Sequence, residues 1–487
     1  MENNNKNTLD NKYEIIDDEF GVGGTAIVKI VKKILSENLY AAKIYYNPEE
    51  ISKYITNEIN ILKYITEKKI PYITNYIDDG KGPLINDEAE EEEDKKYLIL
   101  EYAPKGELLN YIYFPQKGFK EIYSKMIFQK ILESIKALHN LGICHRDLKS
   151  DNIILDDNFN PKICDFGYSI HYEDKNNIKP NRQKIGDKSH IPPQMYYNQP
   201  YNTFKADIFN LGVILFYIIT GKFGFESSNK NNEKYNYIKE HKFEQFWNTF
   251  EIDENIKNLS PEFKNLYFKI VSYNEEERPS IDEILNDEWF NEIRNLDSNK
   301  YKELNDKLIE DFFEREKIYI ENSQIEVETD IEDETSAGYN NLDNETIKKE
   351  YFSSNISPKK INLKSIKNMK NFIKIIGNLK PNVFMNYLAN KIESKNIYEI
   401  QESQDSLEFD LIYEKEEDDY NDDGDNSNNE EEDQDIEYIP EKKIIIQVKL
   451  LETEKNEHYL KFMKKLGNLE EYYKILEDII KETKTLL

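Results

Sequence analysis

Two short polar stretches of the chain contain the side-chain types that phosphoryl transfer needs. His145 to Asn152 reads His-Arg-Asp-Leu-Lys-Ser-Asp-Asn, and Asp165-Phe166-Gly167 begins thirteen positions after Asn152. Transfer of a phosphoryl group to a hydroxyl requires an acceptor for the hydroxyl proton, oxygen ligands for Mg²⁺, and positive charge beside the moving group. Asp147 suits the first task and Lys149 the third. Asn152 and Asp165 carry oxygen atoms that suit the metal.

Apolar residues frame both polar stretches. Ile153-Ile154-Leu155 follows the first and Ile163 precedes the second, which predicts two buried strands flanking a polar loop. Together the two stretches resemble the catalytic loop and the metal-binding turn of eukaryotic protein kinases. The resemblance implies a fold with two lobes and a reaction that uses ATP and Mg²⁺.

A glycine-rich stretch near the N-terminus extends this resemblance. Phe20 to Val28 reads Phe-Gly-Val-Gly-Gly-Thr-Ala-Ile-Val, in which Gly21 and Gly23 match the kinase glycine loop and alanine replaces its third glycine. The resemblance implies that Gly21, Val22 and Gly23 approach the ATP phosphates and that Val28 covers the adenine. A glycine-rich hairpin turn would look similar, so this assignment depends on the residues that follow.

The next segments supply a lysine and a glutamate in the order that the family shows. Tyr40-Ala41-Ala42-Lys43 lies where the third strand of a kinase carries the lysine that holds the α- and β-phosphates, and Ala41 would line the adenine site. Glu58 lies on a predicted helix whose apolar residues share one face. It resembles the helix glutamate that pairs with Lys43; the alternative is a solvated surface glutamate.

Tyr97 to Ala103 predicts a buried strand that leads into the hinge between the lobes. By resemblance, Leu100 lies behind the adenine, and the backbone of Glu101 and Ala103 hydrogen-bonds the base. Ile154, from the strand after the catalytic loop, completes the predicted nucleotide contacts.

The kinase resemblance covers residues 13–293. Asp207 to Gly212 resembles the start of the central helix of the large lobe, and Arg278-Pro279-Ser280 matches the last helices. We expect a bilobal α+β kinase fold, with a β-rich small lobe and a mostly helical large lobe, followed by a small α+β C-terminal domain. Lys149, two positions after Asp147, resembles the serine/threonine class, in the calcium/calmodulin-dependent or AMP-activated group.

The remaining segments are predicted from composition and periodicity. Residues 1–12 are predicted to be disordered, 294–320 to be a helical extension, and 321–358 to be a polar acidic linker. The pattern of residues 359–487 resembles a kinase-associated C-terminal domain, interrupted by an acidic insert at 414–437. Its lysines would suit anionic membrane lipid; the alternative is an autoinhibitory or partner-docking domain.

The segment Gly186 to Gln194 departs from the family. The usual threonine, tyrosine, alanine and glutamate are replaced by Asp187, His190, Pro192 and Gln194. Gln194 carries no charge for the buried Arg278, and Asp187 would repel Asp147. These changes support an alternative function, an ATP-binding regulatory scaffold with weak or no transferase activity.

Arg146 implies an acidic or phosphorylated partner in the activation segment. Residues 168–185 contain no threonine, and their only hydroxyls are those of Tyr168, Ser169 and Tyr172. Glu173 or Asp174 is the alternative partner, which would serve without modification.

Composition narrows the function classes. The formal net charge is −30, which disfavours nucleic acid as a partner, and a protein substrate with a Ser/Thr acceptor is expected instead. The chain has only two cysteines, Cys144 and Cys164, so a reducing, cytoplasmic location is expected, with peripheral membrane association as an option. Cys164 precedes Asp165 and is expected either to ionise easily or to be an inert buried thiol.

Overall fold

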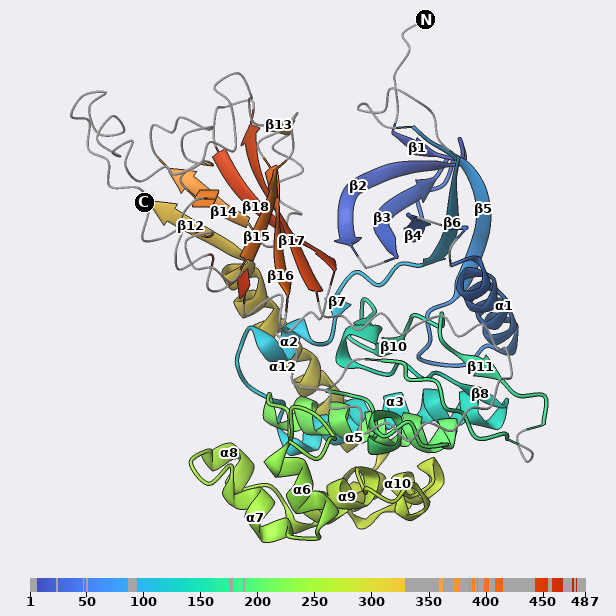
Figure 1. Cartoon of the computed structure of the whole chain (residues 1–487), viewed down its shortest axis with the longest axis vertical. Helices are drawn as coiled ribbons and strands as arrows, with labels where there is room; N and C mark the ends of the chain where they lie inside the picture. Colours follow the sequence, from blue (N-terminus) through green and yellow to red (C-terminus); the bar gives the residue numbers. More distant parts are fainter. Residues whose placement is uncertain are drawn as a thin grey trace, which may run out of the picture. The chain divides into compact units, whose positions relative to one another are not determined.

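The structure is a computed structural model of the chain (Figure 1). It describes residues 7–22, 25–46, 48–49, 51–85, 94–174, 178–186 and 189–328, and beyond these only the short segments within 359–479 that are named below. The chain forms two compact units. One comprises Met1–Phe20 with Thr25–Tyr319, and the other Gly21–Gly24 with Ile320–Leu487.

The small lobe of the first unit is a closed barrel with the strand order β1-β2-β3-β4-β6-β5. Its strands are β1 (Thr8–Leu9), β2 (Tyr13–Val22), β3 (Ala26–Lys33), β4 (Leu39–Tyr45), β5 (Tyr76–Ile85) and β6 (Asp94–Glu101). Ala42 and Ile44 of β4 are buried in the barrel core. Because strand side chains alternate between faces, Ala41 and Lys43 lie on the opposite face, where both are half-buried.

Helix α1 (Ser52–Lys68) connects β4 to β5 and carries Glu58. Its apolar residues Ile55, Ile59 and Leu62 recur at helical spacing and are buried. Glu58 lies on the same stripe and is 2% exposed, so the helix must offer this carboxylate a partner inside the lobe.

The prediction of disorder for residues 1–12 is wrong for residues 7–12. Thr8 and Leu9 form β1, which pairs with both β2 and β5, and Leu9 is fully buried. A two-residue strand has too short a pattern to be recognised in an Asn-rich segment, and its burial depends on partners that lie far along the chain.

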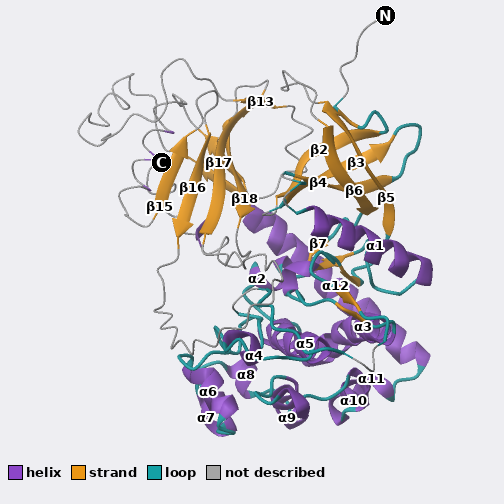
Figure 2. Ribbon diagram, turned by 45° about the vertical axis from the view of Figure 1, so that its right-hand side comes forward, coloured by secondary structure: helices purple, strands orange, loops and turns teal. Residues whose placement is uncertain are grey.

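The large lobe is mostly helical, as Figure 2 shows by colour. Its helices are α2 (Asn110–Tyr113), α3 (Glu121–Asn140), α4 (Pro193–Tyr196), α5 (Thr203–Thr220), α6 (Glu233–Lys239), α7 (Phe243–Asn248), α8 (Glu254–Lys257), α9 (Pro261–Ile270), α10 (Ile281–Asn286) and α11 (Asn291–Arg294). The large lobe also contains short strands, which form two small sheets. They are β7 (Gly106–Glu107), β8 (Ile143–Cys144), β9 (Ile153–Leu155), β10 (Pro161–Ile163) and β11 (Ile170–His171). The strands β9 and β10 pair in antiparallel fashion and bring the two polar turns together.

Helix α5 is the centre of this lobe. Asn202 caps its N-terminus by accepting from the backbone N–H of Phe204, and Gly221 ends it with a φ of 72°. The helix is long and apolar enough to cross a membrane, but 89% of it is buried inside the lobe, as expected of a core helix. Asp207 lies in its second turn and is fully buried.

Helix α12 (Ser298–Ser323) corresponds to the predicted extension 294–320 and belongs to the kinase unit as far as Tyr319. Phe312 is 1% exposed and stacks on Phe159, with a ring separation of 4.9 Å. Arg315 donates to the carbonyl oxygens of Tyr111, Lys117 and Gly118. The helix is thus built into the large lobe.

The second unit contains a mixed sheet with the order β12-β14-β18-β17-β16-β15, and β13 pairs with β17. Its strands are β12 (Gln324–Glu328), β13 (Lys359–Ile361), β14 (Phe372–Ile376), β15 (Tyr398–Glu402), β16 (Glu408–Glu414), β17 (Lys443–Thr453) and β18 (His458–Leu466). Buried helical residues accompany the sheet: Met385, Leu388, Ala389, Ile392, Ile475, Leu476 and Ile479. Strand β12 falls inside the predicted linker 321–358, which is therefore wrong at its start, while most of the acidic insert 414–437 lies outside the described residues.

Candidate active site

The catalytic loop is hydrogen-bonded to helix α5 through Asp207. The carboxylate of Asp207 accepts hydrogen bonds from the backbone N–H groups of His145, at 2.9 Å, and Arg146, at 2.8 Å. His139 lies 2.9 Å from the same carboxylate. Arg146 has a φ of 71°, a left-handed conformation that costs free energy for a residue with a Cβ. The bonds to Asp207 are what fix this turn.

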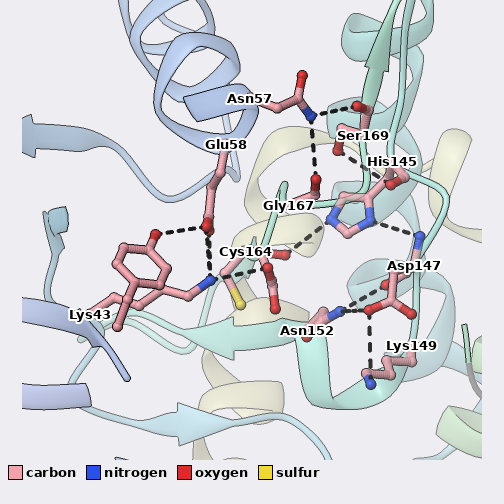
Figure 3. Close-up of polar contacts among 12 residues, drawn as sticks. Lys43, Asn57, Glu58, His145, Asp147, Lys149, Asn152, Cys164, Gly167 and Ser169 are labelled. Atoms are coloured by element: carbon pink, nitrogen blue, oxygen red, sulfur yellow. Dashed lines mark hydrogen bonds and ion pairs between the residues drawn. The ribbon is translucent and has the colours of Figure 1, made fainter. Parts of the chain in front are cut away.

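His145 links the two polar turns, as Figure 3 shows. Its Nδ1 accepts from the backbone N–H of Asp147 at 3.3 Å, and its Nε2 lies 3.0 Å from the carbonyl oxygen of Cys164. Burial lowers the pKa of His145, so the ring is neutral and Nε2 carries the proton that it donates. The histidine therefore sets the distance between Asp147 and Asp165 rather than acting as an acid or base.

Asp147 lies at the centre of the loop, 7% exposed. Asn152 donates to its carboxylate at 3.0 Å and to its backbone carbonyl at 2.8 Å, and Nζ of Lys149 lies 3.9 Å from Oδ2 (Figure 3). Burial raises the pKa of Asp147 to about 6, with Lys149 opposing the shift and Asp165 adding to it. A carboxylate with this pKa is a stronger base than an ordinary aspartate and is still ionised at neutral pH.

Lys43, Glu58 and Asp165 form a charge cluster at the other side of the site, in which the side chains of Lys43 and Glu58 are largely buried and that of Asp165 is half-exposed. Nζ of Lys43 donates to Glu58 at 2.8 Å and to Asp165 at 3.2 Å. Burial disfavours the charge of Lys43, but Asp165 and Glu58 outweigh it and raise the pKa of the amine well above its usual range. Burial also opposes ionisation of Asp165, and the charge of Lys43 reverses this and lowers the pKa of the carboxyl. Lys43 therefore stays protonated and Asp165 ionised.

The predicted adenine contacts share one property. Side chains that line a ligand site should be neither in the core nor fully in solvent, and Val28, Ala41, Leu100 and Ile154 are all half-buried. Val28 pairs with Lys43, and Ala41 pairs with Leu100, so they come from neighbouring strands. Glu101 ends β6 and leads through Tyr102 to Ala103, where the predicted hinge begins.

The glycine loop is only partly described. Gly21 and Val22 end strand β2, and Gly23 lies outside the described residues. The prediction that these residues contact phosphates stays a prediction.

The oxygen atoms at the predicted metal position fit Mg²⁺. The side-chain NH₂ of Asn152 is used by Asp147, which leaves its Oδ1 for a cation, and Asp165 offers an ionised carboxylate. Mg²⁺ prefers such oxygen ligands and commonly takes its remaining ones from water and phosphate. Within the described residues no cluster of three or more His, Cys, Asp or Glu side chains is placed to hold a metal.

Two polar residues of the site were not predicted from the sequence. The hydroxyl of Tyr45 donates to Glu58 at 3.0 Å, and Asn57 donates to the carbonyl oxygens of Gly167, at 3.3 Å, and Ser169, at 2.7 Å. Asn57 precedes Glu58, and Tyr45 lies two positions after Lys43 on the same strand face. These spacings are visible in the sequence, but they do not predict a role for Asn57 or Tyr45 unless the groups that they contact are already known.

The expectation that Cys164 ionises easily is wrong. Burial raises the pKa of its thiol, and the neighbouring charge of Asp165 raises it further. A negative neighbour disfavours a thiolate.

Gln194 meets Arg278, as the sequence predicted, and the arginine is better satisfied than expected. Arg278 donates to Oε1 of Gln194 at 2.8 Å, and also to the carbonyl oxygens of Ser272 and Lys205. Burial lowers its pKa to about 10, so it is charged at neutral pH. The backbone carbonyl groups thus accept hydrogen bonds from the guanidinium of Arg278, whose usual partner in the family is a glutamate. Asp187 lies outside the described residues.

The chain belongs to the protein kinase family, whose catalytic domain matches residues 15–290, more than half of the sequence. It is 28% identical over 304 residues to the serine/threonine-protein kinase SRK2C of Arabidopsis thaliana, covering 60% of this chain and 78% of that protein. It is 34% identical over 197 residues to CBL-interacting protein kinase 10 of Oryza sativa subsp. japonica, covering 40% of this chain and 41% of the relative. It is 30% identical over 287 residues to CBL-interacting serine/threonine-protein kinase 13 of Arabidopsis thaliana, covering 58% and 52% of the two chains.

These similarities confirm the prediction of a serine/threonine protein kinase that uses ATP, and they confirm the barrel-shaped small lobe and helical large lobe. The match ends before helix α12, and the C-terminal unit is not identified by it.

Proposed function

We propose that this kinase transfers the γ-phosphoryl of Mg²⁺-bound ATP with Asp147 as the acceptor of the substrate's hydroxyl proton. Lys43, fixed by Glu58, holds the α- and β-phosphates, and Asn152 and Asp165 hold the metal. Lys149 lies beside Asp147 and offers its charge to the phosphoryl group as it moves. Mg²⁺ supplies charge neutralisation on the phosphates.

The observation that carries this proposal is the pairing of two carboxylates with opposite properties. Asp147 has a raised pKa and Asp165 a lowered one, although both carboxyl groups lie in the same site. Two groups whose environments separate their pKa values in this way suit a base and a metal ligand, respectively.

We further propose that turnover is low, because of Asp187. A Cβ added to Gly186 would lie 3.4 Å from Oδ1 of Asp147, so the glycine that precedes Asp187 in the chain lies beside the catalytic carboxylate. Two like charges about 4 Å apart repel by about 4 kcal/mol at an effective dielectric near 20. Fully expressed in the barrier, this is roughly a thousandfold in rate. If this repulsion stops transfer completely, the protein is the regulatory scaffold without transferase activity that the sequence offered as the alternative function.

The test is phosphorylation of a basic serine/threonine peptide by the purified full-length protein, with Asp165→Ala as the inactive control. We expect slow transfer in the wild type, none in Asp165→Ala, and faster transfer in Asp187→Thr, with ATP binding retained in the wild type and in Asp187→Thr. Asp187→Asn keeps the size of the side chain and removes the charge, so it separates electrostatic repulsion from loop shape. Wild-type turnover that falls in both Asp187 variants contradicts the low-turnover proposal.

For the C-terminal unit we propose a kinase-associated domain that contacts anionic lipid, the kinase domain or a regulatory partner, in a cytoplasmic protein. Strand β14, the buried helical residues Met385, Leu388, Ala389 and Ile392, the strands β15 to β18 and the helical residues Ile475, Leu476 and Ile479 follow the order of elements expected of such a domain. Relatives named for interaction with a CBL partner support a regulatory contact. Sedimentation with anionic and neutral vesicles separates the lipid contact from the other two.

A further inference from the structure

Arg146, next to the catalytic Asp147, joins the catalytic loop to both halves of the activation segment (Asp165–Gln194). Its side chain is 4% exposed. Nη1 donates to the carbonyl oxygen of Tyr168 at 3.3 Å, and Nη2 donates to Oε1 of Gln183 at 3.0 Å. These two oxygens, rather than the expected carboxylate of Glu173 or Asp174, accept the hydrogen bonds of the guanidinium in the described part of the chain.

Gln183 is itself held in place by the core of the large lobe. Its backbone carbonyl accepts from the hydroxyl of Tyr201 at 2.7 Å, and its N–H donates to Oδ1 of Asn181 at 2.7 Å. Asn181 and Tyr201 exchange both backbone N–H···O bonds at 2.9 Å. Tyr201 is 1% exposed and packs with Ile191 and Met195. The amide of Gln183 therefore reaches Arg146 from a fixed backbone.

The hydroxyl groups between Asp165 and Gly186, which are those of Tyr168, Ser169 and Tyr172, do not offer Arg146 an obvious phosphorylated partner. Ser169 is 3% exposed, and its Oγ donates to the carbonyl oxygen of His145. The hydroxyl of Tyr172 accepts from Thr203. Tyr168 is 41% exposed, but it is its backbone carbonyl that contacts Arg146, while its ring packs against Tyr54.

In many kinases a phosphorylated residue orders the activation segment through arginine, because its oxygens supply charge-assisted hydrogen bonds. A neutral amide oxygen can accept from a guanidinium without any modification, and a hydrogen bond to a charged group contributes about 1.5–3 kcal/mol. The amide of Gln183 already occupies that role.

We propose that Gln183 is a positioning residue that orders the activation segment through Arg146, so that the site is assembled without phosphorylation. The proposal concerns the regulation of the site described under Proposed function and rests on that function for its kinetic consequence. The ordering itself is measurable whether or not transfer is fast.

The experiment uses the full-length protein treated with a broad-specificity protein phosphatase, as wild type, Gln183→Ala, Gln183→Glu and Arg182→Ala. Arg182 is the neighbouring control, because it is exposed and donates to the carbonyl of Asn198 instead of contacting Arg146. Hydrogen exchange of peptides that cover residues 178–186 reports order, and kcat and KM for ATP and for the peptide report function.

We expect phosphatase to leave wild-type exchange and kcat unchanged within about twofold. Gln183→Ala should lose protection over residues 178–186 and lower kcat about tenfold, the equivalent of one such hydrogen bond, with KM for ATP unchanged because Lys43 is untouched. Gln183→Glu should restore both readouts, and Arg182→Ala should resemble the wild type.

Loss of protection or of activity on phosphatase treatment of the wild type overturns the proposal, as does a Gln183→Ala protein with wild-type protection. A wild type that shows protection dependent on Gln183 but no transfer with any treatment supports the ordering role and contradicts the proposed catalytic function instead.

Discussion

Asp147 is the residue at which burial and chemistry conflict most directly. Its pKa is raised to about 6 by burial, since the charged form has lost water and Lys149 restores only part of that loss. The base must be ionised to accept a proton, so activity should be lost as the pH falls through the folded-state pKa.

The first residue-scale prediction is that kcat/KM for the peptide decreases about tenfold per pH unit below about pH 6, the pKa of Asp147. A profile that is flat down to pH 5 contradicts the assignment of Asp147 as the base.

The same shift has a consequence for stability. A carboxyl whose pKa is higher in the folded than in the unfolded protein binds more protons when folded, so its contribution to stability falls as the pH rises from about 4 to about 6. Asp147→Asn removes this cost, which is about 3 kcal/mol for a shift of about two units. Without ATP or Mg²⁺, Asp147→Asn should unfold at a higher temperature than the wild type at pH 8 and show little gain at pH 4, although it cannot transfer phosphate. Asp157→Asn, at an exposed position of the turn after β9, is the matched control, and an Asp147→Asn protein less stable than the wild type at pH 8 contradicts the prediction.

The sequence predicted the site residues that belong to family motifs, but not the residues that act only through contacts in the folded chain. Lys43, Glu58 and Asp165 were predicted from the family pattern, and the structure brings them together at hydrogen-bond distance. Asn57 and Gln183 were not predicted, because they donate to or accept from groups that only the folded chain brings near, and an amide side chain at a loop or helix surface has no distinguishing pattern of its own.

At the scale of elements, the amide side chain of Asn57 joins helix α1 to the activation segment. Asn57 spans to the carbonyl oxygens of Gly167 and Ser169, next to the pair formed by Glu58 and Lys43. The ring of Tyr54, one turn earlier, packs on Tyr168 at 5.3 Å. Position of the helix and order of the segment are therefore coupled.

We predict that Asn57→Ala lowers kcat about tenfold, since it leaves two carbonyl groups without their donor and releases α1 from the segment. Asn60→Ala makes the same chemical change at an exposed position of the same helix, so it controls for helix propensity. Equal rates for the two variants contradict the coupling, and a loss of stability without loss of kcat assigns Asn57 a purely structural role.

The sequence predicted long elements better than short ones. The helix around Glu58 follows from apolar spacing over several turns, and the buried helix α5 follows from the resemblance of Asp207 to Gly212 to the central helix of the family. Strands β1 and β12 were missed because each is short and polar, and each acquires its place by pairing with a distant strand: β1 with β5, and β12 with β14. The register of such pairs is a property of the whole sheet and not of the segment.

At the scale of the whole chain, the kinase unit is larger than the part that matches the family. The match ends at residue 290, whereas the first compact unit extends to Tyr319. The additional element is α12, whose Leu308, Phe312 and Tyr319 are each at most 4% exposed. Periodicity predicted the helix, but only its contacts show that it is part of the domain.

The anchor of α12 combines apolar and polar contacts around the segment that follows the hinge. Arg315 is 6% exposed, lies 3.9 Å from the centre of the Phe119 ring and donates to backbone carbonyls at 2.6–2.9 Å. Glu316 pairs with Lys105 at 3.1 Å and accepts from the hydroxyl of Tyr111. A chain without this helix exposes the aromatic groups and leaves buried carbonyl groups without a donor.

We therefore predict that a chain ending at Asp297 is much less stable than one ending at Ser323. Burying each large apolar side chain contributes about 1.5–3 kcal/mol, and three of them approach the whole stability of an ordinary domain. Thermal unfolding with and without ATP and Mg²⁺ measures the difference, and the shorter chain should aggregate or unfold at a lower temperature.

Within the full-length protein, Arg315→Ala should lower the free energy of unfolding by about 2–4 kcal/mol. Lys307→Ala, which removes an exposed ion pair with Glu303 on the same helix, should change it by less than about 0.5 kcal/mol. If the chain ending at Asp297 unfolds at the same temperature as the chain ending at Ser323, the contacts of α12 do not contribute to the stability of the large lobe and the prediction is wrong.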